Sequence, residues 1–210
     1  MSIQHAYNLW ASQYDTNKNK TRDLEAVALR SALAKIPFES CLEIGCGTGK
    51  NTMWLLERAK KVLAVDLSGE MLAKAQEKIN APHVEFKQAD ITTDWQFTND
   101  KYDLISFSLV LEHINNLDHI FKEASKVLHS DGYIYVGELH PFKQYQGTKA
   151  RFDTPDGRQV VECYNHHLSD FIHAAKQHGL AVYQIDEYFD EGDRAGVPRI
   201  LSILFKRNNP

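Results

Sequence analysis

The sequence predicts an α/β fold in which helices cover both faces of a largely parallel sheet. From residue 40 to residue 139, short apolar runs alternate with amphipathic segments, which is typical of βα units. Three closely spaced glycines follow the first apolar run, and two further runs joined by a short loop lie near the C-terminal end. A chain of 210 residues is long enough to bury one core of this kind, so we expect a single domain over residues 1–210.

The expected elements follow in order along the chain. Apolar runs predict five strands at residues 41–44, 62–66, 84–88, 102–109 and 133–139. Apolar residues at helical spacing predict helices at residues 50–59, 69–79, 117–128 and 166–180. Two final strands are expected at residues 180–189 and 199–205. Because only a short loop joins these last two strands, they should be antiparallel neighbours.

Two segments lie outside the alternating pattern. Residues 6–36 look helical apart from a polar break at 15–23, which predicts an N-terminal helical arm, residues 1–38, ahead of a core, residues 39–138. The connection over residues 139–165 contains the sequence TPDG, which is typical of the β-turn of a small hairpin. Connections of this length are usually lids or binding loops. Residues 166–210 then supply the closing helix and strands.

Charge and composition limit the partners. The net charge is -4, and the basic residues form no block that would neutralise phosphates, so we predict no nucleic-acid partner. No apolar run approaches the length of about 20 residues that spans a bilayer, and the first residues lack the pattern of a signal peptide. We therefore expect a cytoplasmic protein with no membrane partner. The cysteines, Cys41, Cys46 and Cys163, fit reduced thiols better than a disulfide framework.

The glycine-rich turn and the next strand end predict a nucleoside site. Gly45, Gly47 and Gly49 stand where the first strand gives way to a helix, so backbone N–H groups can approach a ligand closely. The spacing is G-x-G-x-G, whereas a dinucleotide fold requires G-x-G-x-x-G, which argues against NAD. Asp66 ends the second strand roughly 20 residues later, where a carboxylate can accept hydrogen bonds from ribose hydroxyls.

Four stretches together resemble a known family. LEIGCGTG and VLAVDLSGEML look like the first two motifs of the class I S-adenosylmethionine-dependent methyltransferases. KQADI resembles the segment that contacts adenine, and YDLISFSLVLEHINNLDHIFKEASKVLHSDGYIYVGE is similar to the small-molecule enzymes of ubiquinone and menaquinone biosynthesis. The resemblance implies a Rossmann-like seven-stranded sheet in the order 3-2-1-4-5-7-6 with the last-added strand antiparallel. It also implies S-adenosyl-L-methionine as the cofactor.

The resemblance also assigns cofactor residues by position. It places the methionine part of the cofactor against Glu43, Gly45, Cys46, Gly47 and Gly49. It places the ribose on Asp66, the two faces of the adenine on Leu67 and Met71, and the adenine edge on Asp90 and Ile91. NLWASQYD is similar to an aromatic helix of the family, so Tyr14 is expected to close over the cofactor.

The acceptor side is less defined by the sequence. Methyl transfer is an in-line displacement, and a base is needed only if the acceptor must lose a proton. The expected carboxyl ends of the strands and the long loop carry Glu112, His113, Glu138, His140, His166 and His167. Of these we select His140, His166 and His113 as catalytic candidates, since histidine suits proton removal near neutral pH. The spacing matches no closed metal motif, so we predict no metal, although a divalent ion that orients an oxygen acceptor stays an alternative.

The sequence therefore predicts an enzyme that methylates a small molecule. Aromatic residues in the arm and the loop would suit a lid over an aromatic or hydroxylated acceptor, namely Trp10, Tyr14, Tyr145, Phe152 and Tyr164. The Asn/Asp-Pro-Pro-Tyr pattern of nucleic-acid amino-methylating enzymes is missing after the fourth strand run. A protein acceptor, and a sensor that binds S-adenosylmethionine without turning it over, remain the alternatives.

Overall fold

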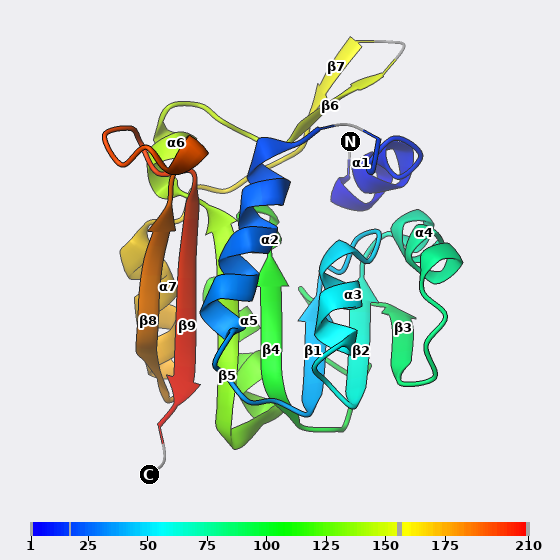
Figure 1. Ribbon diagram of the computed structural model, residues 1–210, viewed down its shortest axis with the longest axis vertical. Helices are drawn as coiled ribbons and strands as arrows, with labels where there is room; N and C mark the ends of the chain where they lie inside the picture. Colours follow the sequence, from blue (N-terminus) through cyan, green and yellow to red (C-terminus); the bar gives the residue numbers. More distant parts are fainter. Residues whose placement is uncertain (1, 17, 155–156, 209–210) are drawn as a thin grey trace.

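The computed structural model describes residues 2–208 except 17, 155 and 156, and it contains the expected seven-stranded sheet (Figure 1). The strand order is β3-β2-β1-β4-β5-β9-β8, which is 3-2-1-4-5-7-6 when only the strands of this sheet are counted. The five strands of the alternating region are β1 Ser40–Ile44, β2 Lys61–Asp66, β3 Val84–Gln88, β4 Tyr102–Ser108 and β5 Leu128–Leu139. The closing strands are β8 Leu180–Tyr188 and β9 Ile200–Arg207.

Pairing within the sheet also agrees with the sequence. The pairs β3–β2, β2–β1, β1–β4 and β4–β5 are all parallel. Strand β9 inserts between β5 and β8 and runs antiparallel to both. The fold class and the strand order predicted from the sequence are thereby confirmed.

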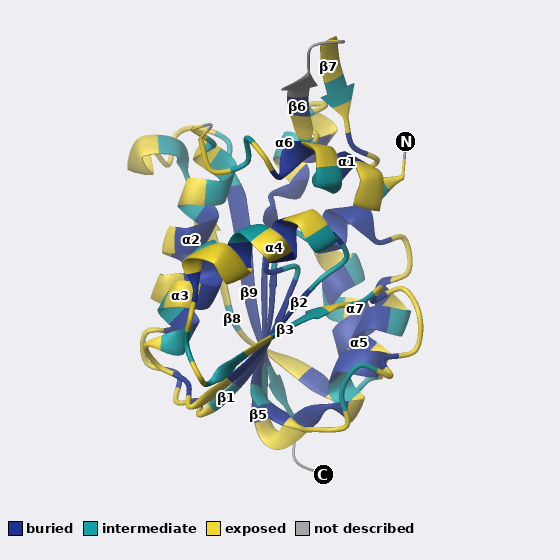
Figure 2. Cartoon of the chain, turned by 90° about the vertical axis from the view of Figure 1, so that its right-hand side faces the viewer, coloured by how far each residue is buried: buried dark blue, intermediate teal, exposed yellow. Residues whose placement is uncertain are grey.

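Helices pack on both faces of the sheet, and each face has its own apolar core. Figure 1 shows α2 (Lys20–Leu33) and α3 (Lys50–Leu56) on the near side, and Figure 2 shows the sheet edge-on between the layers. This side, to which α4 (Gly69–Lys78) contributes Leu72, buries a cluster that includes Leu29, Leu33 and Leu55. On the other side, α5 (Leu117–Lys126) and α7 (Leu168–Gln177) bury a cluster that includes Phe121 and Phe171. In the part of the chain that the structure describes, no helix is both long and apolar enough to cross a membrane.

The N-terminal arm differs from the prediction at its boundaries. Helix α1 (Ile3–Trp10) starts three residues before the predicted Ala6, and α2 begins at Lys20, inside the predicted polar break. The second difference has a local cause. The side chain of Asn19 caps α2 by accepting hydrogen bonds from the backbone N–H groups of Thr21 and Arg22, at 3.1 Å each.

The connection after β5 forms a short helix and a hairpin. Helix α6 (Pro141–Tyr145), which the sequence did not predict, is followed by β6 (Arg151–Thr154) and β7 (Gly157–Val160), an antiparallel pair. The predicted TPDG turn lies partly outside the described residues, because these exclude 155 and 156. The hairpin stands above α1 at the end of the molecule where the strands of the parallel region terminate (Figure 1).

Candidate active site

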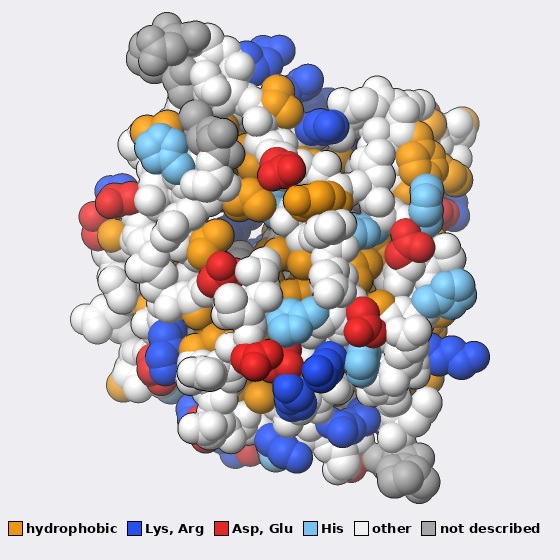
Figure 3. Space-filling model, turned by 180° about the vertical axis from the view of Figure 1, so that it is seen from behind, with side chains coloured by type: hydrophobic (Ala, Val, Ile, Leu, Met, Phe, Trp, Pro, Cys, Tyr) orange, Lys and Arg blue, Asp and Glu red, His pale blue; other side chains and the backbone are white. Residues whose placement is uncertain are grey.

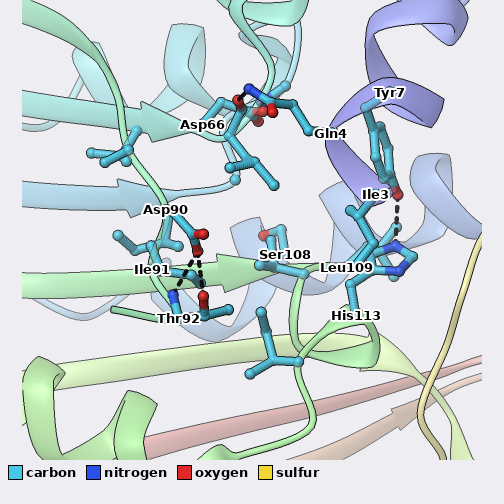
Figure 4. Close-up of a pocket in the computed structure, with 18 of the residues that line it drawn as sticks. Ile3, Gln4, Tyr7, Asp66, Asp90, Ile91, Thr92, Ser108, Leu109 and His113 are labelled. Carbon is cyan, nitrogen blue, oxygen red and sulfur yellow. Dashed lines mark hydrogen bonds between the residues drawn. The ribbon is translucent and has the colours of Figure 1, made fainter. Parts of the chain in front are cut away.

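A cavity of about 390 Å³ opens where β1, β2 and β4 end (Figure 4). The chain leaves β1 and β4 in opposite directions, so this edge is the topological switch point at which open α/β sheets bind ligands. Helix α1 forms the opposite wall. Of the residues predicted from the sequence, the cavity is lined by Tyr14, Gly45, Gly47, Asp66, Leu67, Asp90, Ile91 and His113.

Two backbone hydrogen bonds fix the glycine turn to the neighbouring strand β2. The N–H groups of Gly45 and Cys46 both donate to the carbonyl oxygen of Val65, at 2.7 and 3.0 Å. Gly45 has φ +71°, and a Cβ built there would lie 2.1 Å from Cγ2 of Val110. A residue with a side chain would therefore have both a strained backbone and a steric clash. This arrangement leaves only backbone atoms of Gly45 facing the cavity.

Asp66 organises the turn as well as facing the cavity. One carboxylate oxygen accepts a hydrogen bond from the Gly47 N–H and the other from the Ser68 N–H, both at 2.8 Å. Burial raises the pKa of Asp66, and these backbone donors oppose that rise. Each carboxylate oxygen has a further lone pair, so the group can still accept bonds from a ligand's hydroxyls.

Glu43 lies behind the turn rather than on the cavity wall. Its buried carboxylate accepts a hydrogen bond from the hydroxyl of Thr52 at 2.5 Å. Burial raises the pKa of Glu43 to about 8, against the opposing effect of Thr52. A cationic group bound in front of the turn would favour the ionised carboxylate. Cys46 and Met71 are buried and do not line the cavity. Gly49 is the N-cap residue of α3 and has a left-handed conformation, with φ +84°.

The far end of the cavity is formed by the segment after β3. Asp90 is exposed, and one of its oxygens accepts hydrogen bonds from both the N–H and the hydroxyl of Thr92. Ile91 is buried and presents an apolar surface beside it. Leu67 lines the cavity from the end of β2. A flat apolar group with a polar edge would suit this end, in agreement with the adenine position that the family resemblance implies.

The N-terminal helix contributes residues that sequence reasoning missed. Tyr7 lines the cavity, and Gln4 donates from its side-chain amide to the carbonyl oxygen of Leu67 at 3.1 Å, which fastens α1 to the end of β2. The sequence contains a pattern that could have identified Tyr7, because Tyr7, Trp10 and Tyr14 are spaced three and four residues apart and would lie on one face of a helix. Of these three, only Tyr14 is assigned to the cofactor from the sequence, through the family resemblance, and Tyr7 is not predicted to be a site residue.

His113, in the segment after β4, connects the N-terminal arm with the connection after β5. Its Nδ1 lies 2.7 Å from the carbonyl oxygen of Glu162, so that nitrogen must carry the proton that it donates. In the neutral ring Nε2 is then an acceptor, and the hydroxyl of Tyr7 donates to it at 2.7 Å. Figure 4 shows this pair at the end of the cavity opposite Asp90. His113 is therefore a cavity histidine of fixed tautomer, held by two elements far apart in sequence.

Buried carboxylates stand behind His113. An oxygen of Glu112 lies 3.9 Å from His113 Nε2, and burial raises the pKa of Glu112. Glu138 accepts hydrogen bonds from the backbone N–H groups of Val110 and Leu111, at 2.9 and 2.7 Å, so it shapes the turn after β4. Burial also raises the pKa of Glu138. Glu112, His113 and Cys163 lie close enough to share an ion, but both nitrogens of His113 are already hydrogen-bonded, which disfavours a metal.

The structure places the other two catalytic candidates away from this cavity. Nδ1 of His140 accepts from the Phe142 N–H at 3.2 Å, and its Nε2 lies 3.0 Å from a carboxylate oxygen of Glu187. The Nε2 of His166 lies 2.7 Å from the carbonyl oxygen of Ile114. Neither ring lines the cavity, so the structure brings only His113 together with the predicted cofactor residues.

Known proteins with similar sequences and folds include several methyltransferases. The family model described as a methyltransferase domain matches residues 42–136. An uncharacterized methyltransferase of Emericella nidulans is 26% identical, over 86% of this chain and 76% of its own length. A ubiquinone biosynthesis O-methyltransferase of Pelagibacter ubique is 29% identical, over 53% of this chain and 47% of its own length. The N-methyltransferase NodS of Bradyrhizobium japonicum, solved with S-adenosyl-L-homocysteine, has a TM-score of 0.74 at 18% identity, and the match covers 100% of both chains.

The fold and the glycine turn thus define a class I methyltransferase of Rossmann-like architecture. More particularly, the chain is an S-adenosylmethionine-dependent methyltransferase. The site fits that cofactor, because the turn at Gly45 admits only backbone, Asp66 offers acceptors for hydroxyls, and a buried carboxylate stands behind the turn.

Proposed function

We propose that this methyltransferase acts on a small molecule. The observation that carries the proposal is the enclosure of the cavity by α1 and the turn after it, which contribute Tyr7 and Tyr14 to the lining. The cavity volume, about 390 Å³, is in the range of small-molecule sites. A folded macromolecule could not bring an acceptor atom past this wall without displacing the arm.

The cofactor supplies an activated methyl group on a cationic sulfur. Glu43 and the backbone of Gly45, Cys46, Gly47 and Gly49 hold the methionine end, with the Glu43 carboxylate compensating a positive charge through the turn. Asp66 accepts from the ribose hydroxyls. Leu67, Asp90 and Ile91 surround the adenine with Met71 packed beneath them, while Tyr14 covers the methionine end. The enclosing geometry and the orientation of Asp66 support these assignments.

Tyr7 and His113 are proposed as the proton-accepting pair for an acceptor that must lose a proton. The acceptor O–H or N–H donates to the oxygen of Tyr7, whose own proton passes to Nε2 of His113 as the acceptor forms its bond to carbon. Burial raises the pKa of Tyr7 well above its usual value, so the phenol gives up its proton only as it receives another. The carboxylate of Glu112, 3.9 Å away, stabilises the imidazolium that results.

The resemblance to ubiquinone and menaquinone biosynthesis enzymes makes a phenol or hydroquinone one candidate acceptor. The relative from Pelagibacter ubique, named for ubiquinone biosynthesis, supports this choice. His140 and His166 remain weaker catalytic candidates, since reaching the cavity would require them to leave their present hydrogen bonds.

The test is an acceptor screen with S-adenosylhomocysteine release as the readout. Phenols, hydroxy acids and amines are incubated with the protein and the cofactor, in parallel with an unstructured protein such as casein. Release that depends on a small molecule supports the proposal. Release of S-adenosylhomocysteine with casein alone identifies a protein methyltransferase. Tight cofactor binding without release with any acceptor identifies a sensor.

A further inference from the structure

A second cavity, of about 310 Å³, lies between the start of α2 and the hairpin β6–β7. Four cationic side chains line it: Lys18, Arg22, Arg151 and Arg158. They come from two segments more than a hundred residues apart, so only the fold brings them together. In the view from behind, Lys and Arg side chains gather at the upper edge of the molecule, near the start of α2 and the hairpin (Figure 3).

The positive charge of this cavity contrasts with the rest of the chain. The net charge is -4, yet among the described lining residues none is acidic. Acidic residues of the same arm are committed elsewhere: Asp15 pairs with Lys78 at 2.7 Å, and Asp23 pairs with Lys50 at 2.5 Å. A concave surface lined by charges of one sign concentrates counter-ions. The cavity is therefore suited to an anion.

Aromatic rings form the remaining wall and link this cavity to the first. Trp10 and Phe152 stack with ring centroids 5.1 Å apart and an interplanar angle of 14°. The guanidinium of Arg22 lies over the ring of Tyr14, 4.4 Å from its centroid, and also donates to the Tyr14 carbonyl oxygen. Tyr14 lines both cavities, so the two cavities adjoin at this residue.

We propose that this cavity binds the anionic end of the methyl acceptor, which is a small organic acid with carboxylate or phosphoryl groups. The acceptor extends past the edge of Tyr14 and places its reactive atom beside Tyr7 and His113. Arginine guanidinium groups suit this role because they bind carboxylate and phosphoryl oxygens through paired N–H donors. The inference rests on the proposed small-molecule function and narrows its acceptor to one that carries an acid group separate from the methylated atom.

Binding is tested first without the unknown acceptor. The protein, saturated with S-adenosylhomocysteine, is titrated calorimetrically with citrate and with pyrophosphate as probes. We expect saturable binding that weakens with added salt and becomes at least about tenfold weaker in the Arg151→Gln/Arg158→Gln double variant, because charge-assisted bonds are lost. Lys149→Gln, which removes one positive charge just outside the hairpin, is the control and should bind as the wild type does. Equal affinity in all three proteins, or no binding of either probe, overturns the inference.

Turnover then distinguishes this inference from the function on which it rests. Each hydroxy acid of the screen is paired with its neutral amide, and the ratio of the two kcat/KM values is measured. We expect the acid to be preferred, and Arg151→Gln/Arg158→Gln to reduce kcat/KM for the acid but not for the amide. Preference for the amide overturns the inference and leaves the small-molecule function standing. Methylation of casein with no small molecule turned over overturns both, whereas retained binding of S-adenosylhomocysteine shows that the cofactor site is intact.

Discussion

The cavity wall formed by the ends of β1 and β2 differs in construction from the opposite wall formed by α1 and His113. In the first wall, the turn at Gly45 and the carboxylate of Asp66 are joined by hydrogen bonds between adjacent strands of one sheet. In the second, Tyr7, His113 and Glu162 meet from segments separated by 106 and 49 residues. The cofactor wall is therefore a property of the sheet, while the acceptor wall depends on the docking of the arm and the lid.

Gly45→Ala should give the largest effect, on the cofactor wall. The new Cβ would lie 2.1 Å from Val110 in a backbone conformation that disfavours alanine, so the turn must move. We expect affinity for S-adenosylhomocysteine to fall about a hundredfold or more, measured by calorimetry. Gly179→Ala is the matched control, because it has φ +75° but nothing within 4 Å of the added Cβ. Equal losses in the two variants would mean that general destabilisation by a strained backbone, and not the clash at Val110, weakens binding.

On the acceptor wall, His113→Gln should reduce turnover and leave cofactor affinity nearly unchanged. Loss of the basic nitrogen is expected to lower kcat by about a hundredfold for an acceptor that must lose a proton. The readout is S-adenosylhomocysteine release at saturating cofactor. His140→Gln and His166→Gln are the comparison variants and should have smaller effects, since their rings lie outside the cavity. If either reduces kcat as much as His113→Gln, with unchanged thermal stability, the assignment of the base to His113 is wrong.

Asp66→Ala should weaken cofactor binding without changing the positions of α1 and of the connection after β5. Removing an acceptor for two hydroxyls, and the bonds to Gly47 and Ser68, is expected to cost roughly 1 to 3 kcal/mol, or about ten- to a hundredfold in affinity. Calorimetry with S-adenosylhomocysteine measures the loss. Asp66→Asn keeps one acceptor oxygen and should lose less. An unchanged dissociation constant in Asp66→Ala would remove this residue from the ribose site.

Glu43 makes the cofactor wall sensitive to pH. Its pKa is about 8 in the folded protein and 4.5 for an unperturbed carboxyl, so folding takes up a proton between these values. The contribution of Glu43 to the free energy of unfolding is complete below pH 4.5 and falls as pH rises to about 8, by up to about 1.4 kcal/mol per pH unit.

Urea unfolding of the wild type and of Glu43→Gln across this range measures that difference. The stability of the wild type relative to the variant should decline with rising pH. Cofactor affinity should change in the opposite sense, because a cationic ligand favours the ionised carboxylate. A pH-independent difference between the two proteins would show that Glu43 ionises normally.

The smallest effect is expected at the contact between α1 and the hairpin β6–β7. Phe152→Leu removes the ring that stacks on Trp10 while keeping an apolar side chain, and such ring pairs are worth about 0.5 to 1.5 kcal/mol. We expect a few-fold rise in KM for the acceptor, following that loss, with cofactor affinity unchanged. Val160→Leu, at an exposed position of the same hairpin, is the control. A loss of cofactor affinity in Phe152→Leu would show that the two walls are coupled through Tyr14.

The sequence by itself determined the sheet and most of the cofactor wall. The alternation of apolar runs and helices predicts the parallel sheet, and the family resemblance implies its strand order. The glycine turn directly follows a strand, and Asp66 ends the next one. Such features are local, since a strand end and its turn are specified by neighbouring residues. The site roles given to these residues stay predictions until binding is measured.

Only the tertiary structure decided which residues line the proposed acceptor site. The sequence favoured His140 and His166 over His113, yet of these three only His113 lines the first cavity. Tyr7 and the basic cavity formed by Arg22, Arg151 and Arg158 were not foreseen. Their positions depend on how α1 and the hairpin pack on each other, through contacts such as Trp10 on Phe152. Side-chain packing between distant segments has no local pattern, which is why the fold had to be seen before the acceptor site could be described.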